Sequence, residues 1–101
     1  MKHKLLKFKK GLYEFYKEEV SGNKNISLDL ARKKMTRNML LSEKANSENH
    51  RGQKYKYGSL HFIVNQGGVI TWMNNSCFPP RKWSIDKDKY KQLNKELLIK
   101  G

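Results

Sequence analysis

The sequence predicts an α+β fold with N-terminal helices, a central antiparallel β-hairpin or three-stranded sheet, and a C-terminal helix. Apolar residues recur at three- and four-residue steps near both ends of the chain, whereas the centre alternates in steps of two. Helices have the first period and half-buried strands the second. Because 101 residues suffice for one modest core, we expect a single basic domain over residues 1–101.

The N-terminal segment has helical periodicity over residues 3–20, and a turn at residues 21–23 ends it. Lysines occupy much of its remaining surface. Its apolar stripe consists of Leu5, Phe8, Leu12, Phe15 and Tyr16. We therefore expect the first helix over residues 3–20.

A second helix is expected to begin at Ser27, because serine caps helix N-termini well. Asp29 in its first turn is favoured by the helix dipole. Ala31, Met35 and Met39 share one face of this helix. The polar segment that follows, residues 42–53, is expected to be a loop, with a short helical turn at its start as an alternative.

The centre of the chain has the pattern of a hairpin. In residues 54–57 lysine alternates with tyrosine. In residues 60–65 the apolar residues at 60, 62 and 64 alternate with His61 and the residues at 63 and 65. Residues 69–73 form another β-rich run. Gly67-Gly68 separates the last two runs, which is a strong hairpin signal.

Alternation also predicts which way side chains of this sheet face. Lys54 and Lys56 should lie on one side and Tyr55 and Tyr57 on the other. His61 should lie on the outer face, since it alternates with apolar neighbours. Trp72, in an apolar strand, is expected in the core.

The C-terminal segment is expected to be a helix capped by Ser84 or Asp86. Tyr90, Leu93 and Leu97 would share its buried face. Before it, Pro79-Pro80 excludes a central strand or a helix interior.

The charge of the chain indicates its kind of partner. Lys plus Arg total 22 against 9 Asp plus Glu, a formal net charge of +13. Such a field attracts phosphate backbones, anionic lipid heads or acidic protein surfaces, and nucleic acid has the highest charge density of these. Most of the basic residues are lysines, which A-rich codons encode, so genomic composition is an alternative source of part of the excess.

Several classes of protein are disfavoured. Cys77 is the only cysteine, so no intrachain disulfide forms, and a reducing cytoplasmic location fits. The histidines and Cys77 are too scattered for a structural zinc site, and we expect no metal and no cofactor. Lysines interrupt the N-terminal apolar residues, so neither a signal peptide nor a membrane partner is expected.

One constellation has catalytic potential. His50 and Arg51 precede the lysine-tyrosine strand, and His61 follows it. Metal-free RNA cleavage needs a base, an acid and cations around the phosphorane. His50 and His61 are therefore the candidate catalytic residues. The alternative is that His50 is a solvated loop residue and that the strand lysines protect a sheet edge.

A second basic patch, Arg81-Lys82-Trp83, follows the two prolines. Trp83 could stack on a base, or instead close the core over the C-terminal helix. The residues expected to contact nucleic acid or a partner are Arg32, Lys33, Lys34, Arg37, Arg51, Lys54, Lys56, Tyr57, Arg81, Lys82 and Trp83.

Residues 51–73, RGQKYKYGSLHFIVNQGGVITWM, resemble the core of small toxin-type ribonucleases of the RelE and barnase-like group. The resemblance implies helices followed by a curled antiparallel sheet with the active site on its concave face. It would make Lys54, Lys56, His61 and Arg81 the first positions to test.

The sequence therefore predicts a small nucleic-acid-directed binding protein that acts on RNA, DNA or a nucleoprotein complex, or that binds an acidic protein. One alternative is a metal-free toxin-type endoribonuclease. Another is an inhibitor from a phage or mobile element that blocks a host nucleic-acid-processing enzyme, such as an anti-CRISPR protein.

Overall fold

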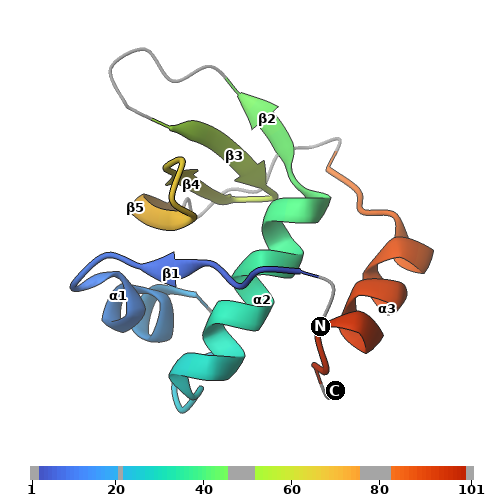
Figure 1. Ribbon diagram of the computed structural model, residues 1–101, viewed down its shortest axis with the longest axis horizontal. Coiled ribbons are helices and arrows are strands. Elements are labelled where there is room, and N and C mark those ends of the chain that lie inside the picture. The colour runs from blue at the N-terminus through green and yellow to red at the C-terminus, as the bar shows by residue number, and fades with distance from the viewer. Residues whose placement is uncertain (1–2, 21, 46–51, 76–82, 100–101) are drawn as a thin grey trace.

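The computed structural model describes residues 3–20, 22–45, 52–75 and 83–99, and these residues form an α+β fold (Figure 1). The predicted fold class is confirmed. No helix in these ranges is long and apolar enough to cross a membrane. The elements are β1 (Lys7–Phe8), α1 (Leu12–Glu19), α2 (Leu28–Leu41), β2 (Glu43–Ala45), β3 (Gln53–Tyr57), β4 (Leu60–Val64), β5 (Val69–Asn75) and α3 (Lys87–Glu96).

The strands form one mixed sheet in the order β1-β5-β4-β3-β2. β1 pairs with β5 in parallel, and the other neighbours are antiparallel. The predicted turn between β4 and β5 is present. The carbonyl oxygen of the Asn65 side chain accepts from the N–H groups of Gly67 and Val69, and Gly68 has a φ of 79° that favours glycine.

Helices α1 and α2 pack on one side of the sheet, which we call the inner face (Figure 1). β3 and β4 send every second side chain into this core. In β5 a bulge opposite Ile63 and Val64 adds one residue, so Ile70 and Met73, three positions apart, both face the core. The buried cluster contains Leu6, Tyr16, Ile26, Ala31, Met35, Leu60, Phe62, Val64, Ile70 and Met73.

The predicted helix over residues 3–20 is wrong for its first half. The Lys7 N–H donates to the Gly68 carbonyl and the Lys9 N–H to the Ile70 carbonyl, which makes this segment an edge strand. The helix begins only after Gly11, whose φ is 89°. Leu6 and Phe8 alternate with lysines, so the segment fits a strand as well as a helix, and pairing with β5 decides between them.

The predicted loop over residues 42–53 also contains a strand. β2 (Glu43–Ala45) extends the sheet beyond β3, with Lys44 opposite Tyr55. Its side chains are mostly exposed, and its charged residues are typical of an edge strand, where they oppose aggregation. The sheet therefore has five strands in the described residues instead of two or three.

Helix α3 stands beside α2, away from the sheet (Figure 1). Both predicted caps are present: the Ser27 side chain accepts from the Leu30 N–H, and the Asp86 carboxylate accepts from the Lys89 N–H. A second apolar cluster joins the two helices. It consists of Leu93, Leu97 and Ile99, with Leu5, Leu30, Leu40 and Leu41 packed against them.

Candidate nucleic-acid interface

The side of the sheet opposite the helices, which we call the outer face, carries two cross-strand rows. In the first row, Lys56 on β3 lies opposite His61 on β4, which lies opposite Asn74 on β5. In the second, Lys54 lies opposite Ile63, which lies opposite Trp72. The alternation of strand side chains places these residues on one face, because Tyr55, Phe62 and Met73 between them point into the core.

The second row brings a cation onto an aromatic ring. The Nζ atom of Lys54 lies 5.3 Å from the centroid of the Trp72 ring. Both side chains are half-buried, and Ile63 between them is only 2% exposed. A cation at this distance is attracted to the face of the ring, so the two groups hold one another in place on the sheet.

The first row contains a histidine whose neutral form is favoured. Partial burial lowers the pKa of His61 below its ordinary value of 6.5, and the charges of Lys54 and Lys56 lower it further. The imidazole therefore has a free ring nitrogen at neutral pH, which can accept a hydrogen bond or a proton.

The outer face is predominantly cationic. Lys7 on β1 pairs with Val69 and joins Lys54 and Lys56 on this side of the sheet. Glu43 on β2 lies opposite Lys56, and it is the one acidic residue that the described strands place there. An anion approaching this face therefore meets lysines on strands to both sides of β5, the strand that carries Trp72.

The basic residues predicted on α2 are engaged with the protein itself. Arg32 Nε donates to the Leu6 carbonyl at 2.8 Å and fixes the N-terminal segment. Lys33 forms an ion pair with Asp29 at 3.0 Å. Lys34 donates to the side chain of Asn23 at 3.2 Å, and burial lowers its pKa.

Arg37, also predicted to contact a partner, is only 7% exposed. Its guanidinium donates to the side-chain oxygens of Asn38 and Asn94 and lies 4.5 Å from the centroid of the Tyr90 ring. Asn94 and Tyr90 belong to α3, so this buried cation joins α3 to α2. Among the described residues no carboxylate pairs with it.

Tyr57 and Trp83, two further predicted contact residues, pack on each other. Their ring centroids lie 5.4 Å apart in an edge-to-face arrangement. A Cβ atom on Gly58 would come within 3.2 Å of the Trp83 indole nitrogen. Burial raises the pKa of Tyr57. Both rings thus cover the end of the β3–β4 hairpin, on the inner face where Tyr57 contacts the core.

Four predicted site residues lie outside the described residues: His50, Arg51, Arg81 and Lys82. The part of the chain that is described brings together Lys54, Lys56 and His61 and separates them from Arg32, Lys33, Lys34 and Arg37. In this part, no three His, Cys, Asp or Glu side chains are close enough to hold a metal ion.

Two residues of the outer face were missed by sequence reasoning. Trp72 was expected in the core, and Asn74 lies just beyond the β-rich run predicted over residues 69–73. Apolar residues occupy both faces of β5, so alternation alone cannot assign Trp72. The available signal was the lysine-tyrosine alternation of β3, since correct pairing with it through β4 would have placed Trp72 beside Lys54.

The fold and the outer face define a small basic α+β protein whose mixed sheet has one side covered by helices and the other lined with lysines, a histidine and a tryptophan. The chain belongs to the YorE family, whose model matches residues 6–96. This match spans every described helix and strand.

A curated relative is the SPbeta prophage-derived protein YorE of Bacillus subtilis (strain 168). It is 37% identical over 93 residues, which cover 85% of this chain and 76% of the relative. An origin in a phage or mobile element, as predicted, is consistent with this relative. No solved structure matches the chain.

Proposed function

We propose that this protein binds single-stranded nucleic acid on the outer face of its sheet. The observation that supports this most strongly is the arrangement of Lys54, Lys56, His61 and Trp72 on neighbouring strands of one face. Two cations beside an aromatic ring match the two repeating parts of a nucleic-acid strand, its phosphates and its bases.

Each group has a distinct part in this binding. Lys54 and Lys56 neutralise phosphates, and releasing the condensed counterions supplies most of the affinity. The Trp72 ring stacks on a base, which requires that the base be unpaired. Asn74 and the neutral imidazole of His61 provide hydrogen bonds between these positions. RNA and DNA strands both satisfy this chemistry.

The first test is a salt series of binding to labelled single-stranded RNA and DNA, followed by fluorescence anisotropy. A double variant, Lys54→Ala with Lys56→Ala, is compared with Lys91→Ala and Lys95→Ala, which remove the same charge from exposed positions on α3. We expect the outer-face pair to reduce the slope of log affinity against log salt by about 1.4, because each phosphate contact on a single strand contributes about 0.7.

The α3 pair should change this slope by much less. Equal losses in the two double variants would show that net charge alone drives binding and would contradict the assignment to the sheet. Absence of binding at low salt would contradict nucleic-acid binding altogether. In that case a stoichiometric complex with an acidic protein or a nucleoprotein enzyme would replace it.

The lowered pKa of His61 supports a second candidate, metal-free RNA cleavage. A neutral imidazole can take the proton of a 2′-hydroxyl as its oxygen attacks the phosphorus, and Lys54 and Lys56 would stabilise the charge that develops on the phosphorane. The P–O5′ bond then breaks, and the imidazolium returns its proton to the departing 5′-oxygen. This candidate agrees with the resemblance of residues 51–73 to toxin-type ribonucleases. It predicts cleavage of RNA but not DNA in EDTA, lost in a folded His61→Ala variant. Cleavage that persists in that variant would exclude His61 as the base.

A further inference from the structure

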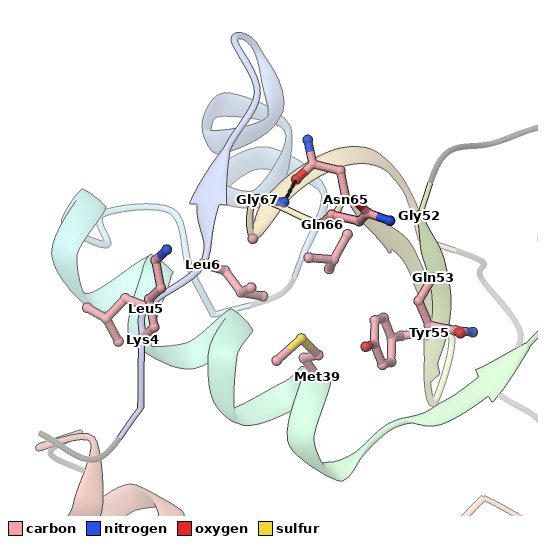
Figure 2. A pocket seen from close by; sticks show the side chains of 12 residues that line it. Lys4, Leu5, Leu6, Met39, Gly52, Gln53, Tyr55, Asn65, Gln66 and Gly67 are labelled. Carbon is pink, nitrogen blue, oxygen red and sulfur yellow. Dashed lines mark hydrogen bonds between the residues drawn. The ribbon is translucent and has the colours of Figure 1, made fainter.

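A pocket of about 940 Å³ lies on the inner side of the sheet, at the end of β3 where Gln53 pairs with Val64. Figure 2 shows residues from four segments around it: Leu5 and Leu6 on one side, Met39 of α2 below, Tyr55 of β3 opposite, and Asn65 with Gln66 above. The volume is within the range of sites that enclose small organic ligands.

The walls of this pocket suit a flat apolar group. Leu6, Met39 and Val64 form apolar surface continuous with the core. The Tyr55 ring stacks on Phe62 with centroids 5.5 Å apart, so its orientation is fixed. Met39 and Tyr55 approach the same space from opposite sides (Figure 2). A planar ring inserted there contacts an aromatic wall and a flexible thioether.

The rim of the pocket carries hydrogen-bonding groups of both kinds. The Gln53 amide nitrogen donates to the backbone oxygens of Ala45 and Lys54, which leaves its carbonyl oxygen as an acceptor. The exposed Gln66 side chain makes no hydrogen bond with the described chain and can donate or accept. Amide side chains of this kind recognise the edges of nucleobases.

The charge around the pocket favours a ligand with a phosphate. Lys4 lies in its wall, and none of the lining residues that the structure describes is acidic. The neighbouring row of the outer face, with Lys54 and Trp72, is one residue further along β3. Because this row lies on the opposite side of the sheet, a strand that occupies both sites would have to pass around the end of the sheet at residues 65–68.

From this chemistry we infer that the pocket binds a single unstacked nucleobase of a nucleotide. A nucleotide combines a flat ring, donor and acceptor groups on the edge of that ring, and an attached phosphate. This inference rests on the proposed function, because it takes the base from a strand held on the outer face. A free nucleotide has the same chemistry, so the test has separate arms for the two sources.

The test records amide NMR spectra of the whole chain during titration with adenosine or uridine monophosphate, and in parallel with a short single-stranded oligonucleotide. We expect both ligands to shift the signals of Gln53, Gln66, Gly67 and Gly68. Shifts from the mononucleotide alone would support the pocket as a site for free nucleotides and overturn its connection with the sheet. Absence of shifts there with both ligands would overturn the site, even where the oligonucleotide shifts Lys56 and His61 and so supports the proposed function.

Two variants make the assignment specific. Met39→Trp fills the pocket from α2, and we expect it to weaken mononucleotide binding about tenfold or more, the order of one base–aromatic contact. Gln66→Glu adds an exposed carboxylate at the rim and should weaken it similarly, whereas Gln92→Glu makes the same charge change at an exposed position on α3. Equal effects of the two glutamate variants, in proteins that retain the native melting temperature, would overturn the site independently of Met39→Trp.

Discussion

The Nζ atom of Lys54 on β3 lies 5.3 Å from the centroid of the Trp72 ring on β5, across the intervening strand β4. The ammonium neutralises a phosphate most effectively when it is held in place, and the ring holds it without cancelling its charge as a carboxylate would. The Trp72 ring is half-buried, so part of its surface is open to solvent beside the cation. This pair is therefore the centre of the proposed interface.

Replacing Trp72 should weaken binding through the bases and not through the phosphates. We expect Trp72→Leu to reduce affinity for a single strand by about 1–3 kcal/mol, the usual contribution of base–aromatic stacking. The slope of affinity against salt should change by much less than the value of about 0.7 for one phosphate contact, because Lys54 keeps its charge when the ring is removed. Anisotropy titrations with Trp83→Phe as the control check this, since Trp83 packs on Tyr57. A loss of salt dependence in Trp72→Leu would contradict the stacking role.

The lowered pKa of His61 predicts two effects of pH. Partial burial, Lys54 and Lys56 keep its pKa below the 6.5 of an unfolded chain, so the unfolded state binds a proton at higher pH than the folded state. The contribution of His61 to the free energy of unfolding is therefore complete above pH 6.5 and is lost as the pH falls through its folded pKa.

Binding should depend on pH with the opposite sign. A phosphate near His61 stabilises the imidazolium, so affinity for a strand should rise as the pH falls through the same range. Titrations of strand binding between neutral and mildly acidic pH should show this rise in the native protein and a smaller one in His61→Asn. The control is His3→Asn, far from the outer face in the N-terminal segment beside Glu96. An identical rise in both variants would assign the effect to other groups.

Arg37 should be important for stability and not for binding. It is 7% exposed and satisfies Asn38 and Asn94 while it stacks on Tyr90. Arg37→Ala leaves these amides without their partner and should lower the free energy of unfolding by about 3 kcal/mol. Urea unfolding measures the loss, and amide hydrogen exchange should accelerate over α3. Affinity for a strand per folded molecule should stay the same, and a specific loss of affinity would restore Arg37 as a contact residue.

The N-terminal strand should depend on one buried hydroxyl. The Leu6 N–H donates to Thr36 Oγ1 at 2.9 Å, and this hydroxyl donates to the Arg32 carbonyl at 2.7 Å. Thr36→Val keeps the shape but leaves the buried Leu6 N–H without an acceptor, which should cost about 1–2 kcal/mol. Thr71→Val, a half-buried position on β5, is the matched control and should change stability by less than about 0.5 kcal/mol. Equal effects in urea unfolding would contradict this anchoring.

The predictable parts of the fold are those that neighbouring residues determine. Ser27 and Asp86 cap helices because their side chains reach backbone N–H groups three residues away. The alternation around His61 identified its face correctly. The segment from Leu6 to Lys9 was predicted wrongly because its apolar residues fit both periods, and a hydrogen bond to Gly68, about sixty residues further along the chain, determines its conformation.

The sequence predicted the cationic character of the candidate site, but it did not predict which of the basic residues belong to the site. Lys54, Lys56 and His61 follow from the alternation of two adjacent strands. The basic residues of α2 have the same chemical character, yet Arg32 and Arg37 serve internal contacts that depend on where Leu6 and α3 lie. The sequence alone does not distinguish one cationic side chain from another. The packing shows which of them face solvent and which make contacts within the protein.

The most direct test of the proposed interface is to map a single strand onto the amide NMR spectrum of the native chain. We predict that the largest shifts fall on Lys54, Lys56, His61, Trp72 and Asn74, and that added salt reverses them as the strand is released. Shifts confined to α2 or α3, with the outer-face signals unchanged at saturating strand, would contradict the assignment of nucleic-acid binding to this sheet.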